Sequence, residues 1–254
     1  LVGSEMCIRD RSMSGLARIL LDRHFTVSGS DAHESELTDE LAKDGCLISY
    51  PQSADNITGD IDLVVYTAAI HPDNKELKAA IAAGIPTMTR AELLGQIMKN
   101  YHTAVNVAGT HGKTTTASMI TEILLAANAD PTISVGGILH SIGGNIRVGS
   151  SDIFVTEACE YTNSFLKFYP TIALITNVEE DHLDFFSGID EIIASFRQFA
   201  YLTKDIGYVV AMGGDKNVQK VLENADDLNI ITYGMESKFD YYPENIVYHA
   251  GFPS

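Results

Sequence analysis

The sequence predicts an α/β fold with a mainly parallel, doubly wound sheet, and three observations predict it. Apolar runs of strand length alternate with amphipathic runs of helix length along the chain, a pattern typical of β-α-β units. Two of the helix-length runs end at a glycine, Gly45 and Gly84, the residue that most often follows a helix. A second series of strands and helices begins near residue 103. The chain is therefore expected to contain two α/β domains.

In the first series, residues 14–24 are expected to form a helix because Leu16, Ile19 and Leu20 share one face. The elements that follow are a strand at 25–28, a helix at 35–44, a buried strand at 62–67, and helices at 74–83 and 92–100. No apolar strand precedes the first helix, although a β-α-β domain should begin with one. We therefore expect residues 1–11 to be a non-native segment, with the first strand missing.

The second series repeats the alternation at greater length. Its expected strands are 103–108, 131–135, 152–157, 171–176, 207–212 and 229–233, and its expected helices are 113–127, 189–202 and 217–224. The boundary between the series lies near residues 100–102, which predicts one domain at 12–101 and a second at 102–254. Residues 241–254 hold no closing element, so we expect the second domain to be truncated.

Composition excludes several classes of partner. A formal net charge of −17 repels polyphosphate backbones, so no nucleic-acid partner is expected. The three cysteines, Cys7, Cys46 and Cys159, form no C-x-x-C pair, which favours a reduced, cytoplasmic protein over a disulfide or zinc framework. No signal peptide and no apolar stretch of membrane-spanning length are evident, so no membrane partner is expected. Oligomeric state leaves no trace in the sequence.

A glycine-rich turn carries the main chemical signal. Residues 105–116 read V-N-V-A-G-T-H-G-K-T-T-T, and small residues there let backbone N–H groups approach phosphate oxygens at a helix N-terminus. Lys113 is expected to reach the terminal phosphates, and the Thr114 hydroxyl to bind Mg²⁺. The spacing is a variant of G-x-x-x-x-G-K-[ST], since Val107 occupies the first position. The loop expected to bind ATP consists of Gly109, Thr110, His111, Gly112, Lys113, Thr114 and Thr115.

Further ligands for Mg²⁺ are expected where neighbouring strands end, because α/β sheets bind ligands at the carboxyl ends of their strands. Glu157 ends the strand at 152–157, and His182 follows the strand at 171–176. Taken singly, Glu157 could be a surface carboxylate and His182 an ordinary loop histidine. Their shared position downstream of a phosphate loop favours a role in metal binding for both.

These motifs resemble those of the Mur ligases of peptidoglycan synthesis, and most closely the alanine-adding branch of that family. The resemblance rests on residues 108–116, on Glu157-Ala158-Cys159-Glu160, and on Thr176-Asn177 followed by Asp181-His182-Leu183-Asp184. It covers roughly residues 12–254, because 12–17 and 29–31 fit the family's N-terminal domain. The resemblance implies a Rossmann-like domain for a UDP-sugar, a P-loop ATPase-type central domain, and a C-terminal domain that this chain lacks.

The resemblance also implies a reaction and roles for individual residues. ATP would phosphorylate the carboxylate of UDP-N-acetylmuramate, and L-alanine would displace phosphate from the acyl phosphate. Lys113 would hold the β- and γ-phosphates, and Asn177 would lie near the transferred group. Metal ligands would be Thr114 and Glu157 for one Mg²⁺ and His182 for a second. The UDP-sugar would contact Ser14, Gly15, Ser30 and Asp31. The lysine and the cations would offset the repulsion between an anionic acceptor and the γ-phosphate.

Two departures from the family pattern limit the expected activity. A Gly-x-Gly-Gly loop should precede Met13, but only Ser14 and Gly15 remain of it. The C-terminal domain, which should bind the amino acid, is absent. We therefore expect this chain to be inactive by itself. Two alternatives stay open: a ligase that recycles murein peptides, and a P-loop switch that hydrolyses nucleotide without either substrate.

Overall fold

The computed structural model describes residues 2–6, 11–67, 70–71, 73–249 and 252–253, and it confirms the expected α/β class. A five-stranded sheet has the order β3-β2-β1-β4-β5, and a seven-stranded sheet has the order β12-β11-β10-β6-β9-β7-β8. A short antiparallel pair, β13 (Tyr248–His249) and β14 (Phe252–Pro253), follows. Contacts group the chain into two compact units, residues 1–101 with 121–154 and residues 102–120 with 155–254, and each is described by itself.

The five-stranded sheet of the first unit is parallel throughout. Its strands are β1 (Val2–Met6), β2 (Thr26–Ser30), β3 (Leu47–Ser49), β4 (Leu63–Tyr66) and β5 (Thr87–Thr89). The expectation that the first strand is missing is wrong, because β1 lies in the centre of the sheet, between β2 and β4. No apolar run marks this strand in the sequence, which reads V-G-S-E-M, and its mixed composition hid it although its backbone pairs on both sides. The non-native origin of residues 1–11 stays a prediction, and residues 7–10 lie outside the described part.

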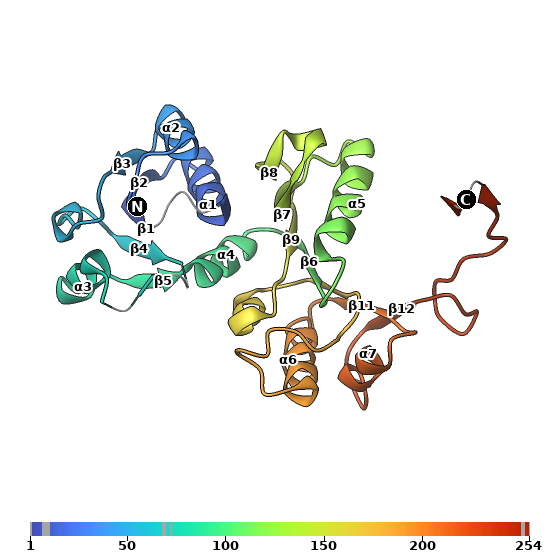
Figure 1. The fold of residues 1–254 in the computed structure, drawn as a ribbon. Coiled ribbons are helices and arrows are strands. Elements are labelled where there is room, and N and C mark those ends of the chain that lie inside the picture. Colours follow the sequence, from blue (N-terminus) through green and yellow to red (C-terminus); the bar gives the residue numbers. More distant parts are fainter. Residues whose placement is uncertain (1, 7–10, 68–69, 72, 250–251, 254) are drawn as a thin grey trace. The chain divides into compact units, whose positions relative to one another are not determined.

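Helices cover both faces of this sheet. They are α1 (Arg11–Asp22), α2 (Glu36–Lys43), α3 (Lys75–Ala82) and α4 (Arg90–Met98), with a 3₁₀ turn, η1 (Ala54–Asn56), before β4. Figure 1 shows α1 and α2 on one side of the sheet and α3 on the other, as right-handed crossovers require when strand order reverses between β1 and β4. Buried side chains of α1, including Met13, Leu16 and Ile19, confirm the apolar face expected from the sequence.

The first unit also contains an antiparallel hairpin of β7 (Thr132–Leu139) and β8 (Gly144–Arg147). The sequence predicts only a strand at 131–135 and loop turns around the glycines. The chain reverses through a 3₁₀ turn, η2 (His140–Ile142), which ends at Gly143 with φ 69°. A left-handed residue at that point suits glycine, which has no Cβ to collide with the backbone.

The second unit contains the strands that carry the glycine-rich loop. These strands are β6 (Thr103–Ala108), β9 (Ile153–Glu157), β10 (Ile172–Ile175), β11 (Tyr208–Met212) and β12 (Ile230–Tyr233). Strand β10 pairs in parallel with β6 and β11, opposing Leu174 to Val107 and Val210. Because parallel strands all end at the same edge, the turns that follow β6 and β10 lie next to each other.

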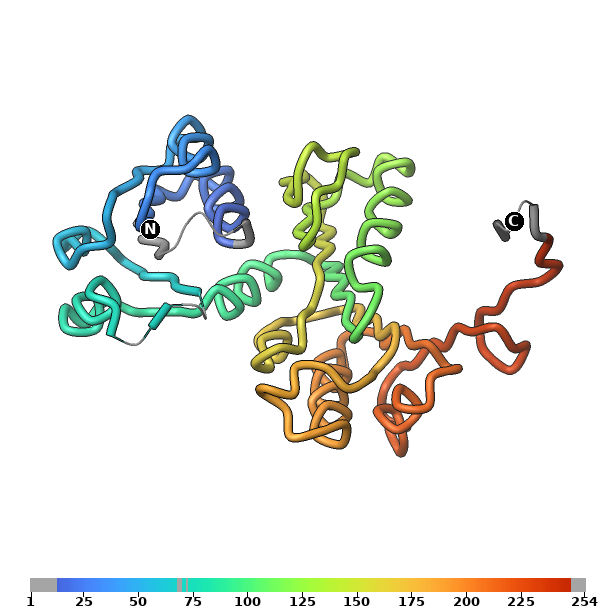
Figure 2. The backbone as a smooth tube through the Cα atoms, in the orientation of Figure 1, coloured from blue at the N-terminus to red at the C-terminus, as the bar shows by residue number. Residues whose placement is uncertain are grey.

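Helices and a 3₁₀ segment complete this part of the chain. They are α5 (Lys113–Ala126), η3 (Tyr161–Lys167), α6 (Ile189–Tyr201) and α7 (Lys216–Val221). After β9 the chain passes through η3 and returns into β10, as the tube in Figure 2 shows. The ring of Phe165 in η3 stacks on Phe199 of α6 with centroids 4.8 Å apart. Among the described residues, none of the helices has the length and apolar character needed to cross a membrane.

Candidate functional site

The turn between β6 and α5 forms a tight loop whose shape depends on glycine. Gly109 has φ 142° and Gly112 has φ 83°, values that side chains with a Cβ rarely adopt. A Cβ on Gly109 would also overlap the Oγ1 atom of Thr176, whereas the space around Gly112 is open. Thr110 fixes the other side of the loop, because its Oγ1 atom accepts from the backbone N–H of Glu179 at 2.8 Å. The loop is therefore held against the segment that follows β10.

Lys113 is the first residue of α5, and its ammonium lies inside the loop. The Nζ atom donates to the carbonyl of Gly109 at 2.6 Å and to that of Thr110 at 3.3 Å. It also pairs with the carboxylate of Glu160 at 3.1 Å. The ammonium is therefore surrounded by oxygen atoms at a helix N-terminus, where backbone N–H groups and the helix dipole favour anions.

Thr114 and Glu157 meet at the strand edge, as the sequence predicts for a shared metal site. The Thr114 Oγ1 atom donates to the Glu157 Oε2 atom at 2.9 Å. A hydroxyl and a carboxylate oxygen at this separation are both hard donors of the kind Mg²⁺ prefers. The donor chemistry of this pair therefore fits a magnesium ion bound with a nucleotide.

Asn177 clamps the backbone of the loop from the β10 side. Its side chain accepts from the N–H of His111 at 2.8 Å and donates to the carbonyl of the same residue at 2.8 Å. The His111 ring points outward, with Nε2 3.6 Å from the Glu179 carboxylate. The described contacts of Asn177 are thus structural, while its expected place near a transferred phosphoryl group stays a prediction.

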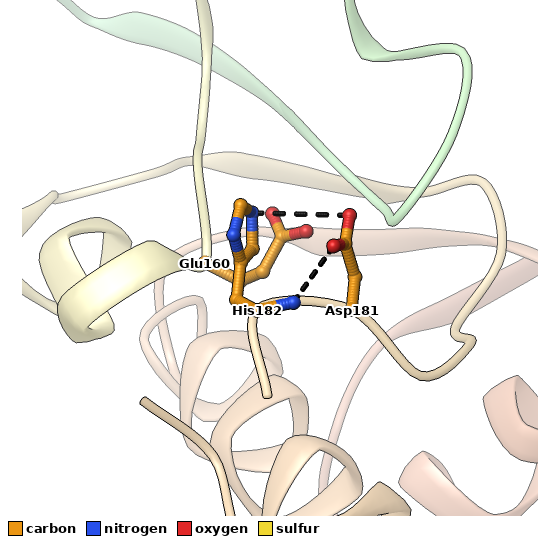
Figure 3. Close-up of side chains that lie close together, drawn as sticks. All are labelled: Glu160, Asp181 and His182. Carbon is orange, nitrogen blue, oxygen red and sulfur yellow. Dashed lines mark hydrogen bonds and ion pairs between the residues drawn. The ribbon is translucent and has the colours of Figure 1, made fainter. Parts of the chain in front are cut away.

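A second group of ligand atoms lies beside the loop (Figure 3). One atom each from Glu160, Asp181 and His182 lies within 4.8 Å of the others. His182 has φ 52°, and its ring packs on Tyr161 with centroids 4.7 Å apart. The Tyr161 hydroxyl donates to Asp184 at 2.9 Å, a bond that raises the pKa of the phenol. Within the described residues, these three side chains form the cluster whose donors suit a metal ion.

Glu160 is the site residue that sequence reasoning missed. Its side chain is 2% exposed, although it ends in a carboxylate. The available signal was the Glu-x-x-Glu spacing after β9, in which Glu157 received a role and Glu160 did not. Sequence patterns cannot show that a glutamate is buried against a lysine 47 positions away.

The expected sugar-binding residues lie in the first unit and are buried. Ser30 and Asp31 follow one another at the end of β2, and each is 1% exposed. The Ser30 hydroxyl donates to the buried carboxylate of Glu76 at 2.6 Å, and Asp31 accepts from the N–H of Ala32 at 2.7 Å. Ser14 is buried within α1. The described contacts therefore shape this strand end, and direct binding of a sugar nucleotide by these residues stays a prediction.

Glu76 is a second buried carboxylate that no sequence motif singles out. It lies in the first turn of α3, where the helix N-terminus favours negative charge. Besides Ser30, it accepts from the backbone N–H of Ser53 at 3.3 Å and from the Asn56 side chain at 2.6 Å. These bonds tie β2, the η1 turn and α3 together next to Asp31.

Comparisons with known proteins match both parts of the chain. The family model "Mur ligase middle domain" matches residues 107–252, and "Mur ligase family, catalytic domain" matches residues 4–102. The UDP-N-acetylmuramate--L-alanine ligase of Lachnospira eligens is 61% identical over 238 residues, which are 93% of this chain and 52% of the relative. That of Agathobacter rectalis is 60% identical over 237 residues, 93% of this chain and 51% of the relative. The chain thus spans about half the length of the curated relatives it matches.

Solved structures agree with these matches. The UDP-N-acetylmuramate:L-alanyl-gamma-D-glutamyl-meso-diaminopimelate ligase from Neisseria meningitides superposes with a TM-score of 0.83 at 25% identity, covering 91% of this chain and 77% of that one. The UDP-N-acetylmuramate-alanine ligase from Thermotoga maritima superposes with a TM-score of 0.78 at 29% identity, covering 92% of this chain and 53% of that one. Each unit, taken by itself, therefore has a fold already seen in solved ligase structures.

Proposed function

Because this chain belongs to the Mur ligase family, we propose that it supplies the sugar-nucleotide and ATP-binding parts of an ATP-dependent ligase that forms carbon–nitrogen bonds. The proposed reaction joins L-alanine to the carboxylate of UDP-N-acetylmuramate in peptidoglycan synthesis. Relatives named for this reaction share about three-fifths of their aligned residues with the chain. The observation that carries the proposal is the position of Lys113 at the start of α5, inside a loop bordered by Thr114 and Glu157.

ATP is the proposed ligand of the loop at 109–115. Backbone N–H groups and the α5 N-terminus would hold its phosphates, and Lys113 would contact the β- and γ-phosphates as a point charge. Thr114 and Glu157 would hold one Mg²⁺, since their oxygens form a hard donor pair. Bound Mg²⁺ would neutralise charge on the triphosphate. This local arrangement binds an anion despite the net charge of −17 on the whole chain.

In the proposed reaction, a carboxylate oxygen of UDP-N-acetylmuramate attacks the γ-phosphorus of ATP. The bond from that phosphorus to the bridging oxygen breaks, and ADP leaves. The amine of L-alanine then attacks the acyl carbon, phosphate leaves with the bonding pair, and the nitrogen loses one proton, which the released phosphate or water takes up as the amide forms. Lys113 stabilises negative charge on the transferring group, a role in which positioned cations act strongly. Asn177 would keep the loop, and with it this ammonium, in position through its bonds to His111.

The sugar nucleotide is assigned to residues 12–101, and ATP to residues 102–254. Strand order reverses between β1 and β4, and open parallel sheets bind nucleotides at such a reversal. Ser14 and Gly15 at the start of α1, together with Ser30 and Asp31 at the end of β2, are the proposed contacts. The bond from Ser30 to Glu76 would give this strand end a fixed shape for recognition.

Ligation of a murein peptide is the second candidate, favoured by the TM-score of 0.83 to the Neisseria enzyme. Identity to that enzyme is 25%, well below the identity to the alanine-adding relatives, so we rank it second. A nucleotide-dependent switch is the third candidate. A cytoplasmic location, predicted from three widely spaced cysteines that form no C-x-x-C motif, accompanies each of these candidates because ATP is the shared substrate.

A hybrid enzyme tests the proposed function. This chain would replace the matching half of the Lachnospira eligens ligase, which supplies the remaining half of the molecule. We expect phosphate release only when UDP-N-acetylmuramate, L-alanine and ATP are all present. The chain alone should bind ATP with Mg²⁺ but release no phosphate. Phosphate release that proceeds without either acceptor would contradict the ligase and favour the switch.

A further inference from the structure

The ammonium of Lys113 has no hydrogen left to offer a phosphate. An ammonium has three N–H donors, and three groups surround this one: the carbonyl of Gly109 at 2.6 Å, the carbonyl of Thr110 at 3.3 Å and the carboxylate of Glu160 at 3.1 Å. A phosphate oxygen must therefore displace at least one of these partners. Of these partners only the Glu160 carboxylate is charged, and the ammonium neutralises it. The free energy of leaving Glu160 without a counter-ion therefore decides how readily Lys113 can turn toward a phosphate.

Glu160 cannot easily lose its partner. Its side chain is 2% exposed, and a buried charge that loses its counter-ion is strongly unfavourable because water cannot replace the lost interaction. If Lys113 turns toward a phosphate, Glu160 needs a substitute cation. The structure offers a place for one.

Asp181 and His182 lie beside Glu160 (Figure 3). Ligand atoms of the three residues lie within 4.8 Å of one another, close enough for one ion to contact all of them. The Asp181 side chain also accepts from the backbone N–H of His182 at 2.7 Å, which fixes the relative position of the two residues. Two carboxylates and an imidazole suit a divalent cation such as Mn²⁺.

We propose that Glu160 is a positioning residue that exchanges partners: it pairs with Lys113 and releases it when a divalent cation binds between Glu160, Asp181 and His182. Lys113 and the cation compete for the same buried carboxylate. Cation and nucleotide then favour each other's binding, because the cation frees the ammonium for the phosphates. The consequence for ATP rests on the proposed function, whereas the competition for Glu160 does not.

Binding of Mn²⁺ to the full chain without nucleotide, followed by electron paramagnetic resonance, tests the competition. Lys113→Met removes the competing ammonium and should tighten Mn²⁺ binding roughly tenfold, a size typical of coupled sites. Adding Glu160→Gln or Asp181→Asn should abolish the gain. The matched control adds Glu180→Gln, which alters an exposed carboxylate next to Asp181 and should preserve the gain in Mn²⁺ affinity. Lys113→Gln, which can still donate to Glu160, replaces Lys113→Met if the latter fails to fold.

ATP binding in EDTA provides a second readout. Without any cation, Glu160→Gln frees the ammonium and should tighten ATP binding roughly tenfold. A merely structural role for Glu160 would weaken binding instead. An unchanged Mn²⁺ affinity in Lys113→Met, or a gain that survives Glu160→Gln, overturns the exchange. Failure of the unsubstituted chain to bind ATP with Mg²⁺ would overturn the proposed function, a result separable from the nucleotide-free Mn²⁺ measurement.

Discussion

At the scale of single residues, Gly109 and Gly112 differ in why a glycine is needed: positive φ at both positions, and lack of space for a Cβ at Gly109 alone. Both have positive φ, so alanine at either position should cost about 1–3 kcal/mol of stability. Only at Gly109 would the new Cβ also overlap a neighbour, the Oγ1 atom of Thr176. We expect Gly109→Ala to lower the free energy of unfolding more than Gly112→Ala, as measured by urea denaturation. Equal losses would show that the fit of the loop against Thr176 is loose.

Asn177 offers a test of how the loop is held. Asn177→Ala removes one bond to the N–H and one to the carbonyl of His111, and should cost about 1–3 kcal/mol of stability, the usual range for bonds of this kind. ATP affinity should fall with it, because the loop backbone loses its support. Asn177→Asp is the matched control, since it keeps the acceptor and loses only the donor. Isothermal titration of ATP into each variant should rank Asp between Asn and Ala.

Asp130 gives the first unit a pH-dependent contribution to stability. Bonds from the side chain and backbone of Ser150, together with the Arg147 guanidinium, hold the pKa of this carboxyl well below its usual range. A lowered folded-state pKa means that the stabilisation is complete above the unfolded value of about 3.9 and is lost as the pH falls through the folded value. We expect Asp130→Asn to destabilise the protein at neutral pH by an amount that shrinks below about pH 4.

The measurement is the free energy of unfolding of both proteins across that range, with Asp226→Asn at an exposed position as the control. A difference between wild type and Asp130→Asn that stays constant down to about pH 3 would rule out the ionised carboxylate as the cause.

The sequence predicts the residues whose role follows from motif spacing, but not those whose role follows from burial. The loop glycines, Lys113, Thr114 and Glu157 follow from a motif and from strand ends, and the structure brings Thr114 and Glu157 together. Glu160 acts through its burial beside Lys113, which no pattern of residue types records. Ser30 and Asp31 lie at the end of β2, as expected. Their burial could not be predicted, because polar residue types are usually exposed.

At the scale of elements, η3 anchors the segment that carries Glu160. Phe165 of η3 is fully buried, stacks on Phe199 and meets Phe196 edge-on with centroids 5.3 Å apart. Phe165→Ala should therefore cost about 3–5 kcal/mol of stability. Because η3 begins directly after Glu160, we also expect weaker binding of Mn²⁺ between Glu160, Asp181 and His182. Phe185→Ala, at a ring that is 41% exposed, should cost less in both measurements.

Chemical denaturation combined with Mn²⁺ titration distinguishes the two effects of Phe165→Ala. A large loss of stability with unchanged Mn²⁺ affinity would show that η3 does not control the position of Glu160.

Long amphipathic elements were predictable, and short ones were not. Helix α6 follows its expected range almost to the residue, because Ile192, Phe196 and Phe199 repeat with helical spacing and are buried. Strands β3 and β5 have three residues each, too few to show an alternating pattern. Strand β1 reads as a mixed polar segment and forms through backbone pairing in the middle of a sheet.

At the scale of the whole molecule, the two α/β units match the two binding functions proposed for them, one for the sugar nucleotide and one for ATP. The first carries a parallel sheet whose strand order reverses at its centre, and the second carries the glycine-rich loop. The formal charge of −17 disfavours anions in general, so the proposed binding of a triphosphate depends on the helix start and on Lys113. The proposed site therefore depends on a single ammonium more strongly than a phosphate site in a basic protein would.

The most direct test of that claim compares Lys113→Ala with the unsubstituted sequence in the hybrid with the Lachnospira eligens ligase. The measurement is the rate of ATP-driven amide formation from UDP-N-acetylmuramate and L-alanine. We expect the rate to fall roughly 100-fold or more, as when a positioned charge-stabilising group is removed from an active site, while circular dichroism shows an intact fold. An undiminished rate would contradict the assignment of the 109–115 loop as the site of phosphoryl transfer.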